Sequence, residues 1–153
     1  MVGDEALARS ICAENPDIFS QFDADDKSLL ARACWETNHN TEAVRIMLDI
    51  GFPMNEPERN HGYDALHNAA WDGNVPLVKL LLERGFPIED KDPDFDATPL
   101  GWCIHAATEA RRSDNDYAGV VALLLGAGAQ FDKGQYPVGH PAIDAVLKTH
   151  FEI

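Results

Sequence analysis

The sequence predicts an all-α solenoid, in which about three helix-turn-helix repeats stack side by side between helical caps at both ends. Similar residues recur at a fixed distance along the chain: Leu30 and Leu66 are 36 residues apart, and Leu66 and Leu100 are 34 apart. A glycine follows each apolar second helix, and Gly51 and Gly85 are again 34 residues apart. A repeat of this length is typical of units that bury their apolar faces only against their neighbours.

We expect the 153 residues to form one domain, since a chain of this length can bury a core by itself. Its expected parts are an N-terminal cap (1–24), three repeats (25–58, 59–92 and 93–132) and a C-terminal half-repeat cap (133–153). The N-terminal cap is expected to be a helix from about residue 5, broken around Asn15-Pro16, with Ala6, Ile11 and Cys12 facing the stack.

The second repeat gives the pattern of one unit most clearly. Residues 65–71 (ALHNAAW) predict a short helix, residues 72–74 (DGN) a turn, and residues 75–83 a longer helix that ends before Gly85. The apolar residues of the longer helix are Val75, Leu77, Val78, Leu80, Leu81 and Leu82. They cover more than one face, which predicts a helix wedged between neighbours. Residues 29–35 and 42–48 predict the corresponding helices of the first repeat.

The third repeat is longer than the second. Leu66 and Gly85 are 19 residues apart, whereas Leu100 and Gly128 are 28 apart. The nine extra residues predict an inserted loop over 106–116, between the two helices. Residues 139–153 begin a further unit and stop after one helix, as expected of a cap.

These residues resemble the ankyrin-repeat family. Residues 64–70 (DALHNAA) stand in place of the family's T-P-L-H-x-A-A, residues 98–100 (TPL) repeat its start, and LLL precedes both Gly85 and Gly128. The resemblance covers about residues 25–130, and TPLGW is also similar to bacterial ankyrin proteins. It implies hairpin finger loops between the repeats. It also implies that His67 bonds to the backbone of an adjacent unit, whereas Gly101 and Ala31 lack such a side chain at the same place.

The resemblance also implies where a partner binds: just after the Ala-Ala pair of each first helix and on both sides of each finger turn. The expected partner-binding residues are Trp35, Glu36, Asn60, His61, Tyr63, Trp71, Asp72, Asp94, Phe95 and His105. Trp35, Trp71 and His105 should lie one above another across three units. Trp71 would then face a groove, as suits a residue type enriched in binding hot spots. The alternative is that Trp71 packs over its own turn against the next unit. Trp102 is expected to pack between units.

The charge limits the kinds of partner. The chain has 26 acidic and 12 basic residues, a net charge of −14, spread over both halves. Phosphates and anionic lipids would be repelled, so we expect neither nucleic acid nor membrane as partner. A solvated, soluble surface is the favoured reason for the acidity, and the alternative is a protein partner with a basic surface. No apolar run is long enough to span a membrane, and the N-terminus lacks a signal-peptide pattern, so a cytoplasmic monomer is expected.

The sequence offers few candidates for a chemical site. The alternating aspartates Asp90, Asp92, Asp94 and Asp96 lack the glycine and glutamate of a calcium loop, which favours a solvated finger loop. The cysteines are Cys12, Cys34 and Cys103, which lack metal-ligand spacing and are expected to be buried, reduced thiols. No nucleotide or hydrolase motif is present, so no cofactor, metal or catalytic residue is expected. Arg111-Arg112 is the one local basic spot, and a solvated loop is favoured there over an anion site.

The favoured function is therefore a non-enzymatic protein-binding module that uses an aromatic and acidic groove. The alternative is a small-molecule or catalytic site, in which His61, His67 and His105 approach one another with Asp72 and the tryptophans. The sequence is also compatible with one domain of a larger protein.

Overall fold

The computed structural model describes residues 5–23, 29–36, 41–54, 64–109 and 115–152. Over these residues the protein is helical and has no strand. The helices form three pairs: α3 (Leu29–Glu36) with α4 (Thr41–Asp49), α5 (Ala65–Trp71) with α6 (Val75–Glu83), and α7 (Pro99–Glu109) with α8 (Tyr117–Gly126). Before them lie α1 (Glu5–Glu14) and a 3-10 helix (Ile18–Gln21), and after them a 3-10 helix (Lys133–Gln135) and α9 (Pro141–Phe151).

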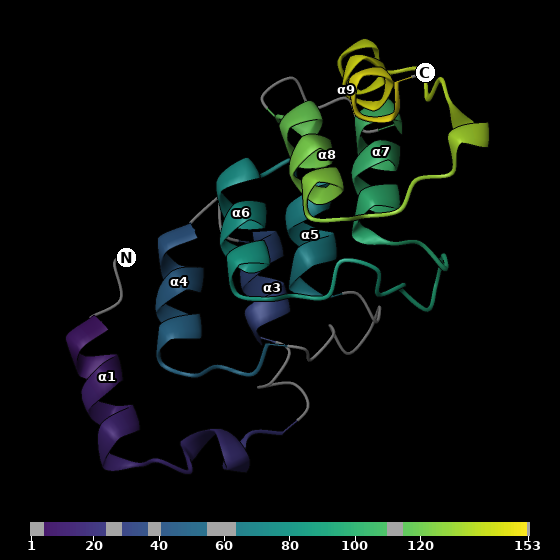
Figure 1. The fold of residues 1–153 in the computed structure, drawn as a ribbon. Helices are drawn as coiled ribbons and strands as arrows, with labels where there is room; N and C mark the ends of the chain where they lie inside the picture. The colour runs from purple at the N-terminus through teal and green to yellow at the C-terminus, as the bar shows by residue number, and fades with distance from the viewer. Residues whose placement is uncertain (1–4, 24–28, 37–40, 55–63, 110–114, 153) are drawn as a thin grey trace.

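The paired helices form two layers (Figure 1). The first helices, α3, α5 and α7, pack one against the next, and the second helices, α4, α6 and α8, do the same beside them. Helix α9 packs on α8, so the two ends of the described chain lie at opposite ends of the stack. The predicted all-α solenoid is confirmed.

Local sequence sets where the helices begin and end. The Asp64 carboxylate caps α5 by accepting hydrogen bonds from the backbone N–H groups of Leu66 (2.8 Å) and His67 (3.0 Å). The glycines predicted to end the second helices all have positive φ, a conformation that costs a residue without Cβ little. They are Gly51 (93°), Gly85 (80°) and Gly128 (104°).

The core lies between the two layers. On α6, Leu77, Val78 and Leu81 are fully buried, while Leu80 and Leu82 are half-buried. This confirms the prediction that the second helix of the central unit is wedged between its neighbours. At the C-terminal end, Ile143 and Leu147 of α9 bury the last apolar surface of α8.

The N-terminal cap differs from the prediction. Helix α1 ends before Asn15-Pro16 as expected, but it has no buried residue: Ala6 is exposed, Ile11 is 42% exposed and Cys12 is only half-buried. The expectation that these three side chains pack on the stack is therefore wrong for Ala6 and Ile11.

Ion pairs hold α1 to the stack instead, while Phe19 and Phe22, which follow α1, pack on Phe52 with ring centroids 5.3 and 5.4 Å away. Arg9 of α1 pairs with Asp49 of α4 (3.2 Å), and Arg45 of α4 pairs with Glu5 of α1 (3.3 Å). Asp49 also pairs with Arg84, which follows α6, so one carboxylate joins three helical segments. The weakly apolar α1 has little surface to bury, which explains why charge replaces packing there.

The third repeat also differs from the prediction in part. Residues 106–109, assigned to the inserted loop, continue α7, which is therefore longer than α5. Ala106 and Ala107 are buried in the core, so packing extends the helix. Residues 110–114, including Arg111-Arg112, lie outside the described residues.

No helix in the described part of the chain has the length and apolar character that crossing a membrane requires.

Candidate functional site

A row of rings crosses the stack of first helices. Trp35 at the end of α3 stacks on Trp71 at the end of α5, with ring centroids 6.4 Å apart and planes 28° apart. His105 of α7 follows, 5.9 Å from the Trp71 ring. Because these three residues hold equivalent places in three stacked helices, they lie one above another, as predicted from the sequence repeat.

Trp71 is both a groove residue and a packing residue. Its side chain is half-buried, and besides Trp35 and His105 it contacts the Trp102 ring edge to face, with centroids 5.4 Å apart. The two interpretations offered for Trp71, facing a groove and packing on the next unit, are therefore each right in part. Trp35 is the more accessible of the two, at 42% exposed.

Trp102 packs between units, as expected. Its side chain is buried, and its indole Nε1–H donates to Asp92 Oδ2 at 2.8 Å. The centroid of its ring lies 5.6 Å from that of His67 and 6.1 Å from that of Phe95. Phe95 itself is 72% exposed, so the rings run from the core to the surface.

Asp92 holds the finger loop before α7. Its carboxylate is buried and accepts hydrogen bonds from the backbone N–H groups of Asp94, Phe95 and Ala97 as well as from Trp102. Burial acts to raise the pKa of this carboxyl, but the hydrogen bonds from Trp102 and the backbone outweigh it and hold the pKa below its usual range. The interpretation of the aspartate run as a solvated loop is thus wrong for Asp92, although Asp90, Asp94 and Asp96 are exposed.

The His67 side chain links two units. Its Nδ1 lies 2.9 Å from Asp64 Oδ1, and its Nε2 lies 3.1 Å from the backbone oxygen of Ala97. The structural role implied for this histidine is confirmed. With one nitrogen bonded to its own cap and the other to the next unit, His67 has no ring nitrogen turned to a substrate.

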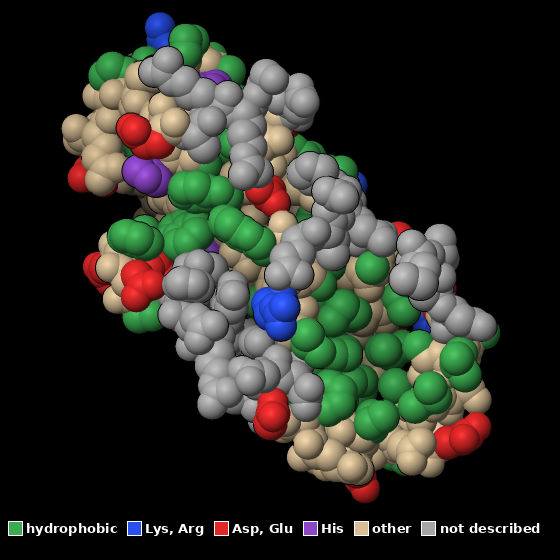
Figure 2. All heavy atoms as spheres, turned by 180° about the vertical axis from the view of Figure 1, so that it is seen from behind, with side chains coloured by type: hydrophobic (Ala, Val, Ile, Leu, Met, Phe, Trp, Pro, Cys, Tyr) green, Lys and Arg blue, Asp and Glu red, His purple; other side chains and the backbone are tan. Residues whose placement is uncertain are grey.

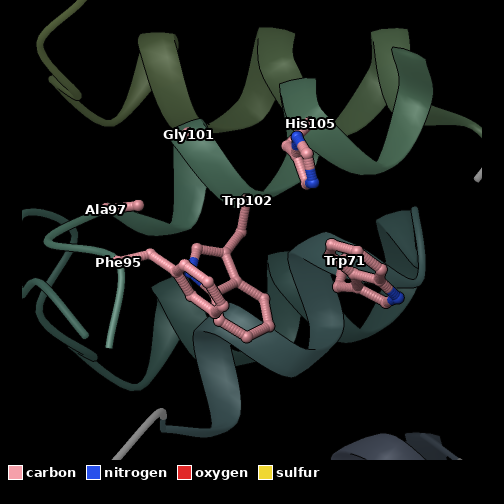
Figure 3. Close-up of a pocket in the computed structure, with 6 residues that line it drawn as sticks. All are labelled: Trp71, Phe95, Ala97, Gly101, Trp102 and His105. Atoms are coloured by element: carbon pink, nitrogen blue, oxygen red, sulfur yellow. The ribbon is translucent and has the colours of Figure 1, made fainter. Parts of the chain in front are cut away.

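A pocket of about 340 Å³ opens beside these rings. Its lining residues are Trp71, Phe95, Ala97, Gly101, Trp102 and His105. In Figure 3, Phe95 and Trp102 lie together near the start of α7, and the His105 side chain points from α7 toward Trp71 on α5. The lining is almost entirely carbon. We call these six residues and Trp35 the aromatic strip.

The remaining predicted site residues are distributed as follows. Asp94 is exposed beside Phe95, and Asp72 is half-buried next to Trp71. Asn60, His61 and Tyr63 lie outside the described residues, as does the side chain of Glu36, so their expected part in the site stays a prediction. Gly101 and Trp102 were not predicted as site residues. The missing side chain at Gly101, noted in the sequence as a departure from His67, was the available signal.

Apolar surface is not confined to the strip. Figure 2 shows hydrophobic side chains exposed in two groups, one over the middle of the stack and a larger one toward the N-terminal end. The large hydrophobic residues that are exposed are Leu7, Ile11, Leu29, Trp35, Met54 and Phe95.

The cysteines and acidic residues form no reactive or metal centre in the described ranges. Burial raises the pKa of the Cys34 and Cys103 thiols well above the usual range, with Asp64 and Asp116 adding to the respective shifts. Both thiols are therefore protonated and inert, as expected of buried cysteines. Over the residues that the structure describes, no three His, Cys, Asp or Glu side chains are arranged to hold a metal ion.

Comparison with known proteins agrees with this architecture. The family model described as "Ankyrin repeats (3 copies)" matches residues 2–92 and 30–137. The chain is similar to the potassium channel AKT1 of Oryza sativa subsp. indica (34% identity over 76 residues, 50% of this chain and 7% of the channel). It is similar to alpha-latrotoxin-Lh1a of Latrodectus hasselti (31% over 104 residues, 58% and 8%) and to ankyrin repeat and SOCS box protein 3 of Bos taurus (49% over 39 residues, 26% and 7%). It spans less than a tenth of each of these relatives.

Proposed function

Because this chain belongs to the ankyrin-repeat family, we propose that it is a non-enzymatic module that binds a partner protein through the aromatic strip. Ankyrin repeats are in general protein–protein interaction modules. The relatives named above are a potassium channel, a latrotoxin and a SOCS box protein, and each shares only a small segment with this chain, so the common property is the repeat scaffold. The repeat fold by itself does not determine which protein is bound.

The observation that carries the proposal is the run of partly exposed rings across three units. Trp35, Trp71, Trp102 and Phe95 are joined by ring contacts of 5.4–6.4 Å, and the two ends of the run are open to solvent. Tryptophan is among the residue types enriched in binding hot spots, and aromatic residues are enriched at interfaces relative to the rest of the protein surface.

The net charge supports a partner with a basic surface. A protein of net charge −14 attracts cationic surfaces at long range and repels nucleic acid and anionic membranes. Near the strip, Asp94 is exposed, and the Lys91 side chain is paired with Asp96 at 2.7 Å. We expect the protein to bind as a monomer.

The alternative of a catalytic or small-molecule site, in which His61, His67 and His105 approach one another with Asp72, has less support. Both ring nitrogens of His67 are bonded, one to Asp64 and the other to the Ala97 oxygen, and His61 lies outside the described residues. His105 alone offers an imidazole at the pocket, without a second titratable side chain among the lining residues.

Affinity capture from extracts of the organism that encodes the protein tests the proposal. Wild type, Trp35→Ala and Leu29→Ala are immobilised, and bound proteins are compared by quantitative mass spectrometry. Leu29 is the matched control because it is a large, 38% exposed residue of the same helix. A protein bound through the strip should be retained by Leu29→Ala and reduced about 30-fold by Trp35→Ala, as for an anchor worth about 2 kcal/mol. Higher salt should weaken its capture.

Equal capture by all three proteins would contradict the proposal and would mean that the partner binds another surface of the repeats. Trp35 is used alone because Trp71 is half-buried among three rings, so its truncation would also disturb packing.

A further inference from the structure

The third unit has a glycine at the place where the second has a histidine, and this glycine lines the pocket of the aromatic strip. His67 and Gly101 each follow the leucine that aligns the repeats, Leu66 and Leu100. In the second unit the imidazole reaches the Ala97 oxygen of the next unit. In the third unit Gly101 places no side chain at the wall of the pocket.

Neither backbone nor packing requires this glycine. Gly101 lies in α7 without the positive φ that favours glycine elsewhere in the chain. A Cβ there would meet the Ala97 Cβ at 3.5 Å and Thr98 Oγ1 at 3.8 Å, which is ordinary van der Waals contact. Glycine lowers helix stability relative to alanine, so its use here keeps space open at the expense of the helix.

The lining suits an apolar occupant. Trp71, Phe95 and Trp102 supply ring carbon, and the polar atom of Trp102 is already bonded to Asp92. A charged or strongly polar group would lose its hydration and gain few partners, since the lining side chains offer only the His105 imidazole and the Trp71 indole N–H. The pocket volume is near the lower end of the range for ligand pockets, about 300 Å³, so the pocket has room for one large side chain.

The surroundings of the pocket are acidic. Asp94 and Asp96 flank Phe95, Asp72 follows Trp71, and the whole chain has a net charge of −14. We call these three aspartates the rim of the pocket. If a partner segment inserts a side chain into the pocket, the residues next to that side chain would lie over the rim. Basic residues there would be attracted to the aspartates, whereas acidic residues would be repelled.

We propose that the pocket beside Gly101 receives one large apolar or aromatic side chain from a segment of the partner protein, with Lys or Arg residues next to it. This inference rests on the proposed function and adds the chemistry of the partner segment. Burial of the apolar side chain in the pocket supplies binding energy, and the aspartates of the rim favour partner segments with Lys or Arg beside that side chain.

A displayed library of random linear peptides provides the probe. The library is selected on wild type, on Gly101→Leu, which fills the pocket, and on Gly126→Leu. Gly126 is the matched control: it is a helical glycine whose Cβ position has no neighbour within 4 Å, at the end of α8. Gly101→Leu should melt no lower than wild type, because it removes a helix glycine, and Gly101→Ala is a smaller change at the same place.

We expect wild type to enrich peptides that share one large apolar or aromatic residue flanked by Lys or Arg. Affinity for such a peptide should fall at least about tenfold in Gly101→Leu, less in Gly101→Ala, and stay within about twofold in Gly126→Leu. Alanine at the shared apolar residue of the peptide should cost wild type a similar factor.

Enriched peptides that bind Gly101→Leu as well as wild type would overturn the pocket inference and leave the proposed function standing. A consensus with only basic residues, or no enrichment on wild type, would also overturn it. The proposed function itself fails on a different result, the equal capture of partners by wild type and Trp35→Ala.

Discussion

Replacing Asp92 by alanine should destabilise the protein by about 3–5 kcal/mol, a large effect for a residue in a loop. The Asp92 side chain is 1% exposed and accepts from Trp102 Nε1 at 2.8 Å and from three backbone N–H groups at 2.8–3.2 Å. Alanine leaves the buried indole N–H without its acceptor, which alone costs about 1–3 kcal/mol. The backbone donors are only part-buried, so water satisfies some of them and the total stays below the sum of four bonds.

Guanidinium denaturation followed by Trp fluorescence measures this difference in free energy of unfolding. Asp90→Ala is the control, because Asp90 belongs to the same acidic run but is exposed. Its effect should stay within about 0.5 kcal/mol. A cost below about 1 kcal/mol for Asp92→Ala would refute the view that this carboxylate organises the finger loop.

The same residue gives the stability a defined pH dependence. Because the folded protein holds the pKa of Asp92 below its usual range, its contribution is fully present above the unfolded pKa of about 4 and is lost as pH falls through the lower folded value. The difference in stability between wild type and Asp92→Asn should therefore be constant from about pH 5 to pH 7 and should shrink below about pH 4. A difference that grows on acidification would contradict the assigned direction.

Three further perturbations test the packing, the pocket and the cap. Leu81→Ala should cost about 2–5 kcal/mol in denaturant unfolding, because Leu81 is fully buried between units; a cost under half a kilocalorie would mean that α6 is not wedged as described. Gly101→Ala should instead raise the free energy of unfolding by about 0.5–1 kcal/mol, and a loss would mean that the glycine is required by the helix. Asp49→Asn should weaken the ion pairs to Arg9 and Arg84 and speed amide hydrogen exchange in residues 5–14, measured by mass spectrometry; unchanged exchange would show that α1 is held by other contacts.

The parts of the fold that follow from the repeat could be predicted from the sequence. A glycine at a fixed distance after each apolar helix marks a helix end wherever it occurs, and equivalent positions in stacked helices must lie side by side. For this reason the repeat alone predicts the row of Trp35, Trp71 and His105, which the ring contacts confirm. The all-α class rests on the same regularity.

The features that were missed depend on partners far along the chain. In the run EDKDPDFD one aspartate looks like another, and the burial of Asp92 is set by the Trp102 indole ten residues later. The docking of α1 depends on Arg9 and Arg45 meeting Asp49 and Glu5 from different helices. Helical periodicity reports which face is apolar, but it contains no information on such charge pairs.

The hydrogen bonds of α5 have a consequence for how the protein unfolds. Asn68 Nδ2 donates to the Ala31 oxygen of α3 at 2.8 Å, while the adjacent His67 bonds to the Ala97 oxygen before α7. In a linear array of repeats, the cooperativity of unfolding is set by the coupling between neighbouring repeats. Here two successive residues of α5 bond to the repeats on both sides of the central one. The central unit therefore joins its flanking units into one cooperative block, whereas α1, which lacks a buried residue, can fray without disturbing that block. Thermal fluctuation should thus begin at the N-terminal edge and leave the aromatic strip among the last surfaces to lose its shape.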